Sequence, residues 1–164
     1  MRPKKISVKE SLRHSFKDGI FASIMSGMTD QYFTPFALAL GATAQQIGWV
    51  SGLPNLCGSI SQLFAVQAIH HIGGRLKLLV RTVATQATLL FFIALVVWFN
   101  FPYPVELFLL LLIFFVANGA LAGPAWGSLM TEYIPNRKRG RYFGWRNQIL
   151  GIIHVASMVG AGLL

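Results

Sequence analysis

Long stretches without charged side chains limit what this chain can fold into more than any other feature. Asp, Glu, Lys and Arg are absent from residues 31–74, 82–105, 107–131 and 147–164. A helix of about 20 apolar residues crosses a bilayer core about 30 Å thick, so each of these stretches is long enough to cross it. Strands of membrane barrels are about 9 to 11 residues long and alternate in polarity, which these stretches do not. We therefore predict an all-α integral membrane protein.

Five transmembrane helices are predicted. The first uncharged stretch, extended back to Asp18, holds two helices, and turn-forming Gly, Pro and Asn residues separate the others. The predicted spans cover residues 18–40, 46–69, 78–99, 105–131 and 143–164, after a basic cytoplasmic N-terminus of residues 1–17.

The basic residues predict the orientation of these spans. The 14 Lys and Arg residues fall into three groups. One group precedes the first span, the second lies between the second and third spans, and the third lies between the fourth and fifth spans. Some members of the last two groups lie just inside the third or the fifth span. The positive-inside rule then places the N-terminus and both basic loops in the cytoplasm, for a protein of the inner or plasma membrane. Anionic lipid headgroups explain the net charge of +9, so a nucleic-acid partner is not expected.

Several functional classes lack the residues that they need. Cys57 is the single cysteine, so no disulfide is expected, and neither a CxxC nor an HExxH spacing occurs. No second acid in the middle of a span accompanies Asp30, and no spacing typical of an activated nucleophile is present. We expect no metal, no cofactor and no enzymatic activity.

Asp30 is the leading candidate for function, because an ionisable group at membrane depth is costly. On a helix it shares one face with Ser23, Ser26 and Thr34, and Pro35 permits a kink beside it. Two interpretations stay open. Asp30 is either a substrate-binding or proton-carrying carboxylate facing a watery cavity, or a structural carboxylate bonded to neighbouring hydroxyls.

Polar side chains on other spans predict a cleft walled by the first, second, fourth and fifth helices, with the third helix outside. Asn118 is either an interhelical hydrogen-bonding residue or part of this cleft, and His154 is either a hydrogen-bonded core residue or a ligand. A ridge of small residues from Gly119 to Gly127 favours close helix packing. The candidate residues for a substrate or coupling-ion cavity are Asp30, Thr34, Asn55, Gln62, Asn118, Asn147 and His154.

The loops resemble those of the Major Facilitator Superfamily. The segment 132–144, with an acid, a proline and Arg139-Gly140-Arg141, is similar to the family's segment between the fourth and fifth helices. The outer turn 40–48 is also similar. In the loop 70–77, Gly73 matches the inner glycine of the family's signature and Arg75 its final basic residue. Departures from this signature occur at Val66, His70, His71 and Gly74.

This resemblance implies a secondary transporter that works by alternating access, of which the chain is about the first five of twelve helices. It implies a small-molecule solute and a missing C-terminal half without which this fragment is not expected to transport. The arginine that many relatives use for proton coupling has no counterpart in the fourth span, so proton coupling (symport) is expected to depend on Asp30 alone. The implied cytoplasmic gate residues are His70, Gly73, Arg75, Arg139, Gly140 and Arg141. A non-transport membrane scaffold or assembly partner is the alternative function.

Overall fold

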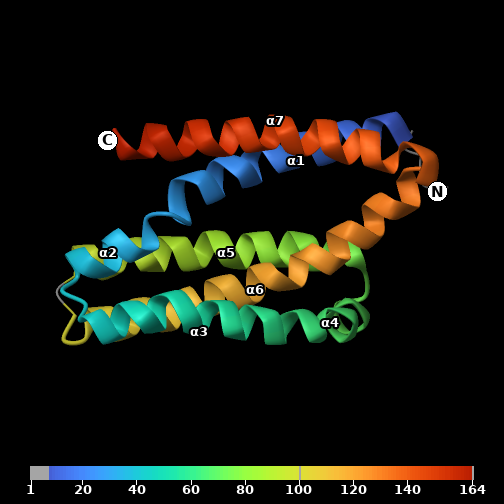
Figure 1. Ribbon diagram of the computed structural model, residues 1–164. Helices are drawn as coiled ribbons and strands as arrows, with labels where there is room; N and C mark the ends of the chain where they lie inside the picture. The colour runs from blue at the N-terminus through green and yellow to red at the C-terminus, as the bar shows by residue number, and fades with distance from the viewer. Residues whose placement is uncertain (1–7, 100, 164) are drawn as a thin grey trace. The chain divides into compact units, whose positions relative to one another are not determined.

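The computed structural model describes residues 8–99 and 101–163, and the described residues form seven helices joined by short turns (Figure 1). They fall into two compact units, one of residues 8–32 and 130–163 and the other of residues 33–129. The all-helical prediction is confirmed for the described residues. The two units are described separately below.

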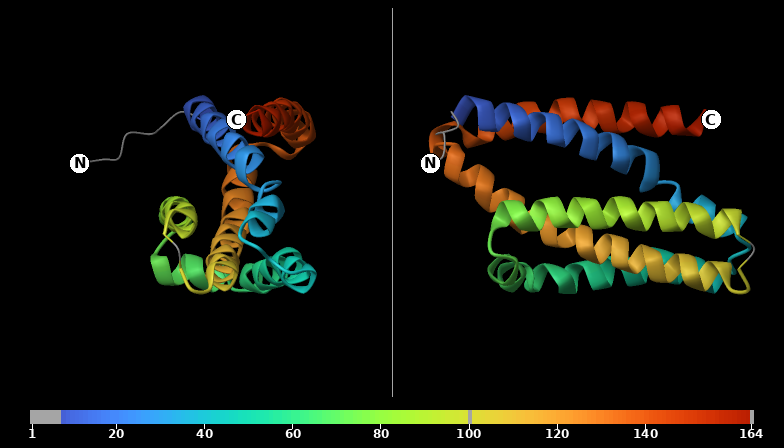
Figure 2. Two further views of the ribbon diagram at one scale, coloured as in Figure 1. Left: turned by 90° about the vertical axis from the view of Figure 1, so that its left-hand side faces the viewer. Right: turned by 180° about the vertical axis from the view of Figure 1, so that it is seen from behind.

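The first unit consists of two long helices that run in the same direction. These are α1 (Val8–Thr29) and α7 (Asn136–Gly162), together with the last turn of α6 (Pro104–Tyr133). Along α1, Gly19 lies against Leu150, Gly27 against His154, and Tyr32 against Gly162, so contacts advance together along both helices. Figure 2 shows the two helices side by side.

The second unit contains the rest of α6 and four further helices. These are α2 (Phe33–Ala39), α3 (Ala44–Leu63), α4 (Ala65–Ile72) and α5 (Arg75–Trp98). Thr43 begins α3 with a capping box, in which its hydroxyl accepts from the backbone N–H of Gln46 and the Gln46 side chain accepts from the Thr43 N–H. Gln46 also donates to Glu106 at 2.9 Å, which joins the start of α3 to the start of α6.

The second unit is held together by aromatic packing and by close helix contacts. Phe36 and Phe108 lie 4.9 Å apart between ring centroids, and Phe33 lies edge-on to Phe115 at 5.7 Å. Gly58 approaches Val116 so closely that an added Cβ would lie 3.1 Å from its side chain. These contacts place α2 and α3 against α6, with Phe108 completely buried.

The first predicted span differs from the observed helices. Instead of one helix over 18–40, the structure has α1 from Val8 and α2 from Phe33, separated by a turn at residues 30–32. A continuous helix would lose a hydrogen bond at Pro35, which has no N–H to donate. In the first turn of α2, where that N–H has no helical partner, Pro35 is tolerated. Asp30 therefore lies at a helix break.

The other predicted spans correspond to observed helices with shifted ends. The predicted helix 46–69 is divided at Phe64 into α3 and α4, and α7 begins at Asn136, before the predicted start at residue 143. The charges of residues 137–141 mark where lipid is expected to end. They do not stop a helix, because a helix also forms in water.

Among the described residues, two helical segments are long and apolar enough to cross a membrane by length and composition alone, Arg75–Val96 and Pro104–Glu132. They coincide with the third and fourth predicted spans. The other three predicted spans do not pass this criterion: charged residues occupy the first half of α1, and polar residues recur along α3 and along α7 after Arg146. Five transmembrane helices therefore stay a prediction.

Candidate functional site

The α1–α7 pair brings Asp30, Ser26 and His154 into one neighbourhood. Ser26 Oγ lies 3.2 Å from Nδ1 of His154, across the interface between the two helices. Asp30 follows Ser26 by four residues, and its backbone N–H still donates to the Ser26 carbonyl oxygen at 2.9 Å. Asp30 therefore lies one helical turn beyond the residue that contacts His154. Two of the predicted cavity residues thus lie together in the first unit.

The turn after α1 is fixed by contacts on both sides of Asp30. Thr29 donates its hydroxyl hydrogen bond to the Met25 carbonyl at 2.8 Å and lies 3.3 Å from an Asp30 carboxylate oxygen. Tyr32 donates from its hydroxyl to the carbonyl of Met158 at 2.7 Å. This bond joins the end of α1 to α7 and holds the turn in place. Asp30 itself is exposed.

Close backbone contact keeps the two helices together beside this site. A Cβ on Gly27 would lie only 2.4 Å from the backbone oxygen of His154 and 3.0 Å from the Ser157 side chain. Small residues permit such approaches between helices in lipid. Gly27 therefore sets the distance over which Ser26 reaches the imidazole.

Arg146 is buried in the same helix pair, about two turns before His154. Its guanidinium donates to the carbonyl of Ser15 at 3.4 Å and covers Gly19, which has no side chain. Phe16 stacks on Trp145 with ring centroids 5.1 Å apart. Sequence reasoning assigned Arg146 only to the basic end of the fifth span, and it missed this packing role.

The polar stripe of the second predicted span is present as an exposed row on α3. Asn55 donates to the carbonyl of Ser51 at 2.7 Å, and Ser59 donates to the carbonyl of Asn55 at 2.9 Å. Gln62 is exposed on the same helix. These bonds engage the Asn55 amide and the Ser59 hydroxyl with the backbone of their own helix.

Asn118 makes the interhelical contact that was one of its two predicted roles. Its side-chain amide donates to the backbone carbonyl of Thr82 on α5 at 2.8 Å. Nearby, Gln86 of α5 covers Gly119 of α6. Of the predicted ridge of small residues, Gly119 has this close neighbour, whereas Gly123 has none within 4 Å among the described residues of its unit.

The remaining predicted cavity residues lie apart from one another. Thr34 is half-buried on α2 in the second unit, and Asn147 is exposed on α7 in the first. The structure therefore does not assemble all seven candidates into one cavity.

Two of the predicted gate residues, Gly73 and Arg139, stabilise helix ends. Gly73 ends α4 in the left-handed conformation, with φ 79°, and its N–H donates to the carbonyls of Ile69 and His70. His70 is exposed, and Arg75 begins α5. A left-handed turn at this position explains a glycine there, because a Cβ would be strained.

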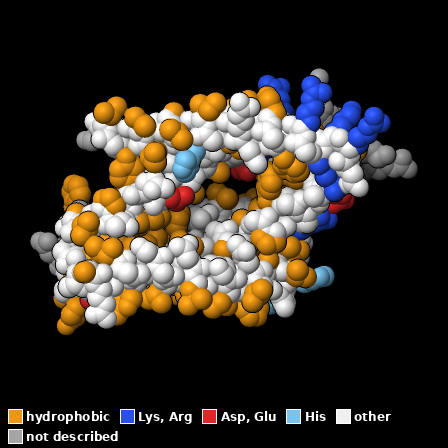
Figure 3. Space-filling model, viewed as in Figure 1, with side chains coloured by type: hydrophobic (Ala, Val, Ile, Leu, Met, Phe, Trp, Pro, Cys, Tyr) orange, Lys and Arg blue, Asp and Glu red, His pale blue; other side chains and the backbone are white. Residues whose placement is uncertain are grey.

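Arg139 closes the end of α6. Its Nε donates to the Ile134 carbonyl at 2.9 Å, and its guanidinium also donates to the Thr131 carbonyl. The last carbonyls of a helix have no helical partners, so this side chain satisfies them. Gly140 and Arg141 are exposed. Lys and Arg side chains gather at the end of the pair where α1 and α7 begin (Figure 3).

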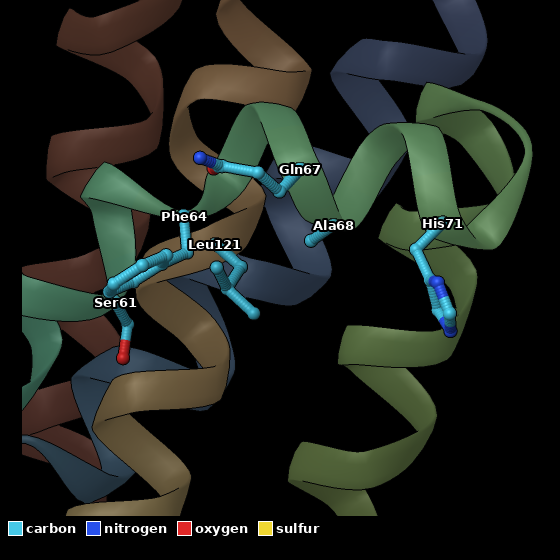
Figure 4. A pocket seen from close by; sticks show the side chains of 6 residues that line it. All are labelled: Ser61, Phe64, Gln67, Ala68, His71 and Leu121. Atoms are coloured by element: carbon cyan, nitrogen blue, oxygen red, sulfur yellow. The ribbon is translucent and has the colours of Figure 1, made fainter.

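A cleft of about 490 Å³ opens in the second unit where α3 meets α4. Figure 4 shows its lining, which comes from α3, α4 and α6 and consists of Ser61, Phe64, Gln67, Ala68, His71 and Leu121. Oriented with its NH₂ toward the backbone, the Gln67 amide donates to the carbonyls of Leu63 and Phe64 at the helix break, 3.3 Å each. None of the seven predicted cavity residues lines this cleft.

These features define an all-helical protein with long apolar helices and a carboxylate at a helix break. The sequence profile of the Major Facilitator Superfamily matches residues 19–164, which is most of the chain. The chain belongs to the Major Facilitator Superfamily, and the resemblance read from its loops is confirmed. Members of this family are integral membrane proteins that act as transporters and not as enzymes. The chain matches no curated protein and no solved structure.

Proposed function

We propose that this chain is the N-terminal part of a secondary transporter that moves a small solute by alternating access. Solute movement is coupled to protons by the carboxylate of Asp30, in a symport reaction. The five predicted spans cross the inner or plasma membrane, with the N-terminus in the cytoplasm. A second helical half of the same transporter supplies the other wall of the pathway, as in transporters built from repeats.

The observation that carries this proposal is the helix break at Asp30. α1 ends at Thr29 and α2 begins at Phe33, so the one acid in the middle of a predicted span lies between two helix ends. Discontinuous helices near the midplane commonly form the substrate and ion sites of secondary transporters. The structural alternative for Asp30, a carboxylate satisfied by hydroxyls, has less support, because Thr29 is its one hydroxyl neighbour with a described hydrogen bond.

The parallel arrangement of α1 and α7 supports the proposed orientation. In a chain that crosses the membrane at every span, the first and fifth helices must run in the same direction. Arg13 and Lys17 on α1 and the basic residues 137–141 on α7 then share one end of the pair. The positive-inside rule assigns that end to the cytoplasm.

Polar side chains on three helices supply hydrogen bonds to the solute in this proposal. Asn55 and Gln62 lie exposed on α3, Asn147 is exposed on α7, and Thr34 lies on α2. Arg139, Gly140 and Arg141 belong to the cytoplasmic gate, where Arg139 keeps the end of α6 rigid. Asn118 serves mainly to join α6 to α5.

Solute uptake coupled to proton entry tests this function. The protein encoded by the continuous reading frame that contains this chain is reconstituted in vesicles that hold a pH-sensitive dye. A panel of sugars, small peptides, drugs and organic ions is then added outside the vesicles. We expect one class of solute to be accumulated together with proton entry. Asp30→Asn removes accumulation, whereas Asp18→Asn, the same change at an exposed residue of α1, retains it. Accumulation by Asp30→Asn at the wild-type level would exclude Asp30 from coupling.

A further inference from the structure

Ser26 on α1 and His154 on α7 are joined by a hydrogen bond whose direction follows from a second bond of the serine. The Ser26 hydroxyl donates to the carbonyl of Ala22, one turn earlier on α1, at 3.0 Å. A serine hydroxyl has a single hydrogen, so toward another partner its oxygen can only accept. Nδ1 of His154 is that partner, 3.2 Å away. Nδ1 therefore carries a proton and donates to the Ser26 oxygen.

The other ring nitrogen of His154 is then a hydrogen-bond acceptor. A neutral imidazole has one N–H and one lone pair, on opposite nitrogens. With the N–H at Nδ1, the lone pair is on Nε2. No hydrogen bond to Nε2 is found among the described residues. Ser26 is a positioning residue, because its bond to Nδ1 decides that the ring presents an acceptor, and not a donor, at Nε2.

His154 lies at the edge of the contact between α1 and α7. Leu150, one turn earlier on α7, lies against Gly19 of α1, and the His154 backbone lies against Gly27. Gly151, three residues before His154, is open, because a Cβ added there meets no described atom of its unit within 4 Å. Residues three and four apart on a helix are surface neighbours. The imidazole therefore lies between a packed strip of α7 and an open one.

The depth of His154 makes an unused lone pair costly. His154 is at the middle of the predicted span 143–164. Ionisable side chains at that depth face the interior of the helix bundle or a water-filled cavity, and they mark solute pathways. Packing alone is better served by an apolar side chain, because an unpaired polar atom is unfavourable in hydrocarbon. Solute sites of secondary transporters also lie near the midplane of the bilayer.

We propose that Nε2 of His154 accepts a hydrogen bond from the transported solute, and that Ser26 sets this specificity by holding the ring as its Nδ1–H tautomer. The solute belongs to the class that carries an O–H or N–H donor, such as a sugar, a peptide or an amine. A group that offers only lone pairs, such as a carboxylate, is repelled by the lone pair of Nε2. This inference rests on the proposed transport function and names its solute class, and it does not depend on proton coupling through Asp30.

The tautomer of His154 can be measured directly. The 164-residue chain is labelled with ¹⁵N-histidine, placed in phosphatidylcholine–phosphatidylglycerol nanodiscs, and studied by ¹⁵N NMR at alkaline pH, where imidazole is neutral. The spectrum distinguishes protonated from unprotonated ring nitrogens, and the signals lost in His154→Gln are those of His154. We expect the proton at Nδ1. A ring protonated at Nε2 would overturn the assignment.

Variants of Ser26 separate positioning from packing. Ser26→Ala removes the acceptor and shifts the neutral ring toward the Nε2–H form, whereas Ser26→Thr retains Nδ1–H because it keeps a hydroxyl. Ser23→Ala, the matched loss of a half-buried hydroxyl on the same helix, leaves the tautomer unchanged. A spectrum of His154 that does not respond to Ser26→Ala contradicts the role of Ser26.

Uptake by the protein encoded by the continuous reading frame tests the solute class. The probes are glucose, glycylglycine and ethanolamine, which carry O–H or N–H donors, and acetate and tetraethylammonium, which carry none. We expect a donor probe to be accumulated in the reconstituted vesicles. Accumulation restricted to acetate or tetraethylammonium would overturn the proposed class.

Two substitutions at His154 test the contact with the solute. His154→Asn keeps an amide N–H at the position of Nδ1 and has no atom at the position of Nε2, whereas His154→Gln places an amide oxygen near the position of Nε2. For the accumulated donor probe, we expect His154→Asn to raise KM about tenfold, which corresponds to one hydrogen bond, with a smaller change in kcat. His154→Gln raises KM less. A wild-type KM in His154→Asn refutes the contact.

Ser26→Ala links the tautomer to transport without altering the ring itself. It converts Nε2 from an acceptor to a donor, so KM for the same donor probe rises, and Ser26→Thr keeps the wild-type KM. A tautomer that shifts in Ser26→Ala while KM stays constant excludes His154 from the solute site. The spectra need no transport, so failure of every probe to accumulate refutes the proposed function, whereas NMR still decides the positioning role of Ser26.

Discussion

The substitution Gly27→Ala tests how the candidate site is held together. The added Cβ would lie 2.4 Å from the His154 backbone oxygen, 3.2 Å from its carbonyl carbon and 3.0 Å from Ser157 Cβ. Ordinary contacts of this kind begin at 3.4 Å, so the methyl group is about 1 Å too close to the oxygen. Backbone atoms of a helix cannot rotate away as a side chain can. We therefore expect α1 and α7 to separate locally.

The expected loss of folding stability follows from the cost of inserting extra methyl groups into packed cores of other proteins. Inserting a methyl group into a packed interface costs about 1–3 kcal/mol. Such a change raises the equilibrium constant for unfolding by about one to two powers of ten. Alanine is also the better helix former, by about 1 kcal/mol in water, which offsets part of this cost. The net effect of Gly27→Ala is a loss of stability.

Unfolding by sodium dodecyl sulfate in mixed micelles measures this loss. The matched control is Gly151→Ala on α7, which adds the same methyl group where no atom of its unit lies within 4 Å. We expect Gly27→Ala to unfold at a lower detergent fraction than the wild type, and Gly151→Ala to unfold at an equal or higher one. If both variants unfold at the same detergent fraction, the close α1–α7 contact is refuted.

Three further substitutions test the contacts that hold helix ends and helix pairs. Asn118→Leu removes the hydrogen bond to α5 and lowers the free energy of unfolding in detergent by about 0.6 kcal/mol. The control Asn147→Leu alters an exposed side chain and lowers the free energy of unfolding by less. Arg139→Ala exposes the last carbonyls of α6 and speeds amide hydrogen exchange just after that helix. In the control variant Arg141→Ala, the exchange rate of the same amides stays at the wild-type value. Equal exchange rates in the two variants would contradict the capping role of Arg139. Gly73→Ala forces a side chain into the left-handed turn at φ 79° and lowers stability by about 1 kcal/mol, so an unchanged unfolding midpoint would count against this turn.

The positions of the helices were largely predictable from the sequence, because charge is excluded from lipid over long distances along the chain. The third predicted span, 78–99, lies within α5 except for its last residue, and the fourth, 105–131, lies within α6. The kink permitted by Pro35 became a complete break at residues 30–32. A proline indicates where a helix is weak, but tertiary contacts decide how far it opens.

Pairing between distant residues was not predictable. The stripe on the first span included Ser26, and His154 was found on the fifth span, but their contact depends on which helices are neighbours and in which register. The role of Arg139 was hidden for the same reason. Its position in a basic loop indicates a charged surface, whereas its hydrogen bonds to Ile134 and Thr131 depend on the path of the turn after α6.

The threading of the chain through the membrane is the claim on which the transport proposal depends. Single cysteines placed in a Cys57→Ser background are labelled in sealed vesicles with a maleimide that does not cross lipid. The account predicts that Ala42→Cys and Tyr103→Cys react only from the outer side, and His71→Cys and Lys138→Cys only from the cytoplasmic side. Labelling of Ala42→Cys and Lys138→Cys from the same side would contradict the five-span topology and the pathway built on it.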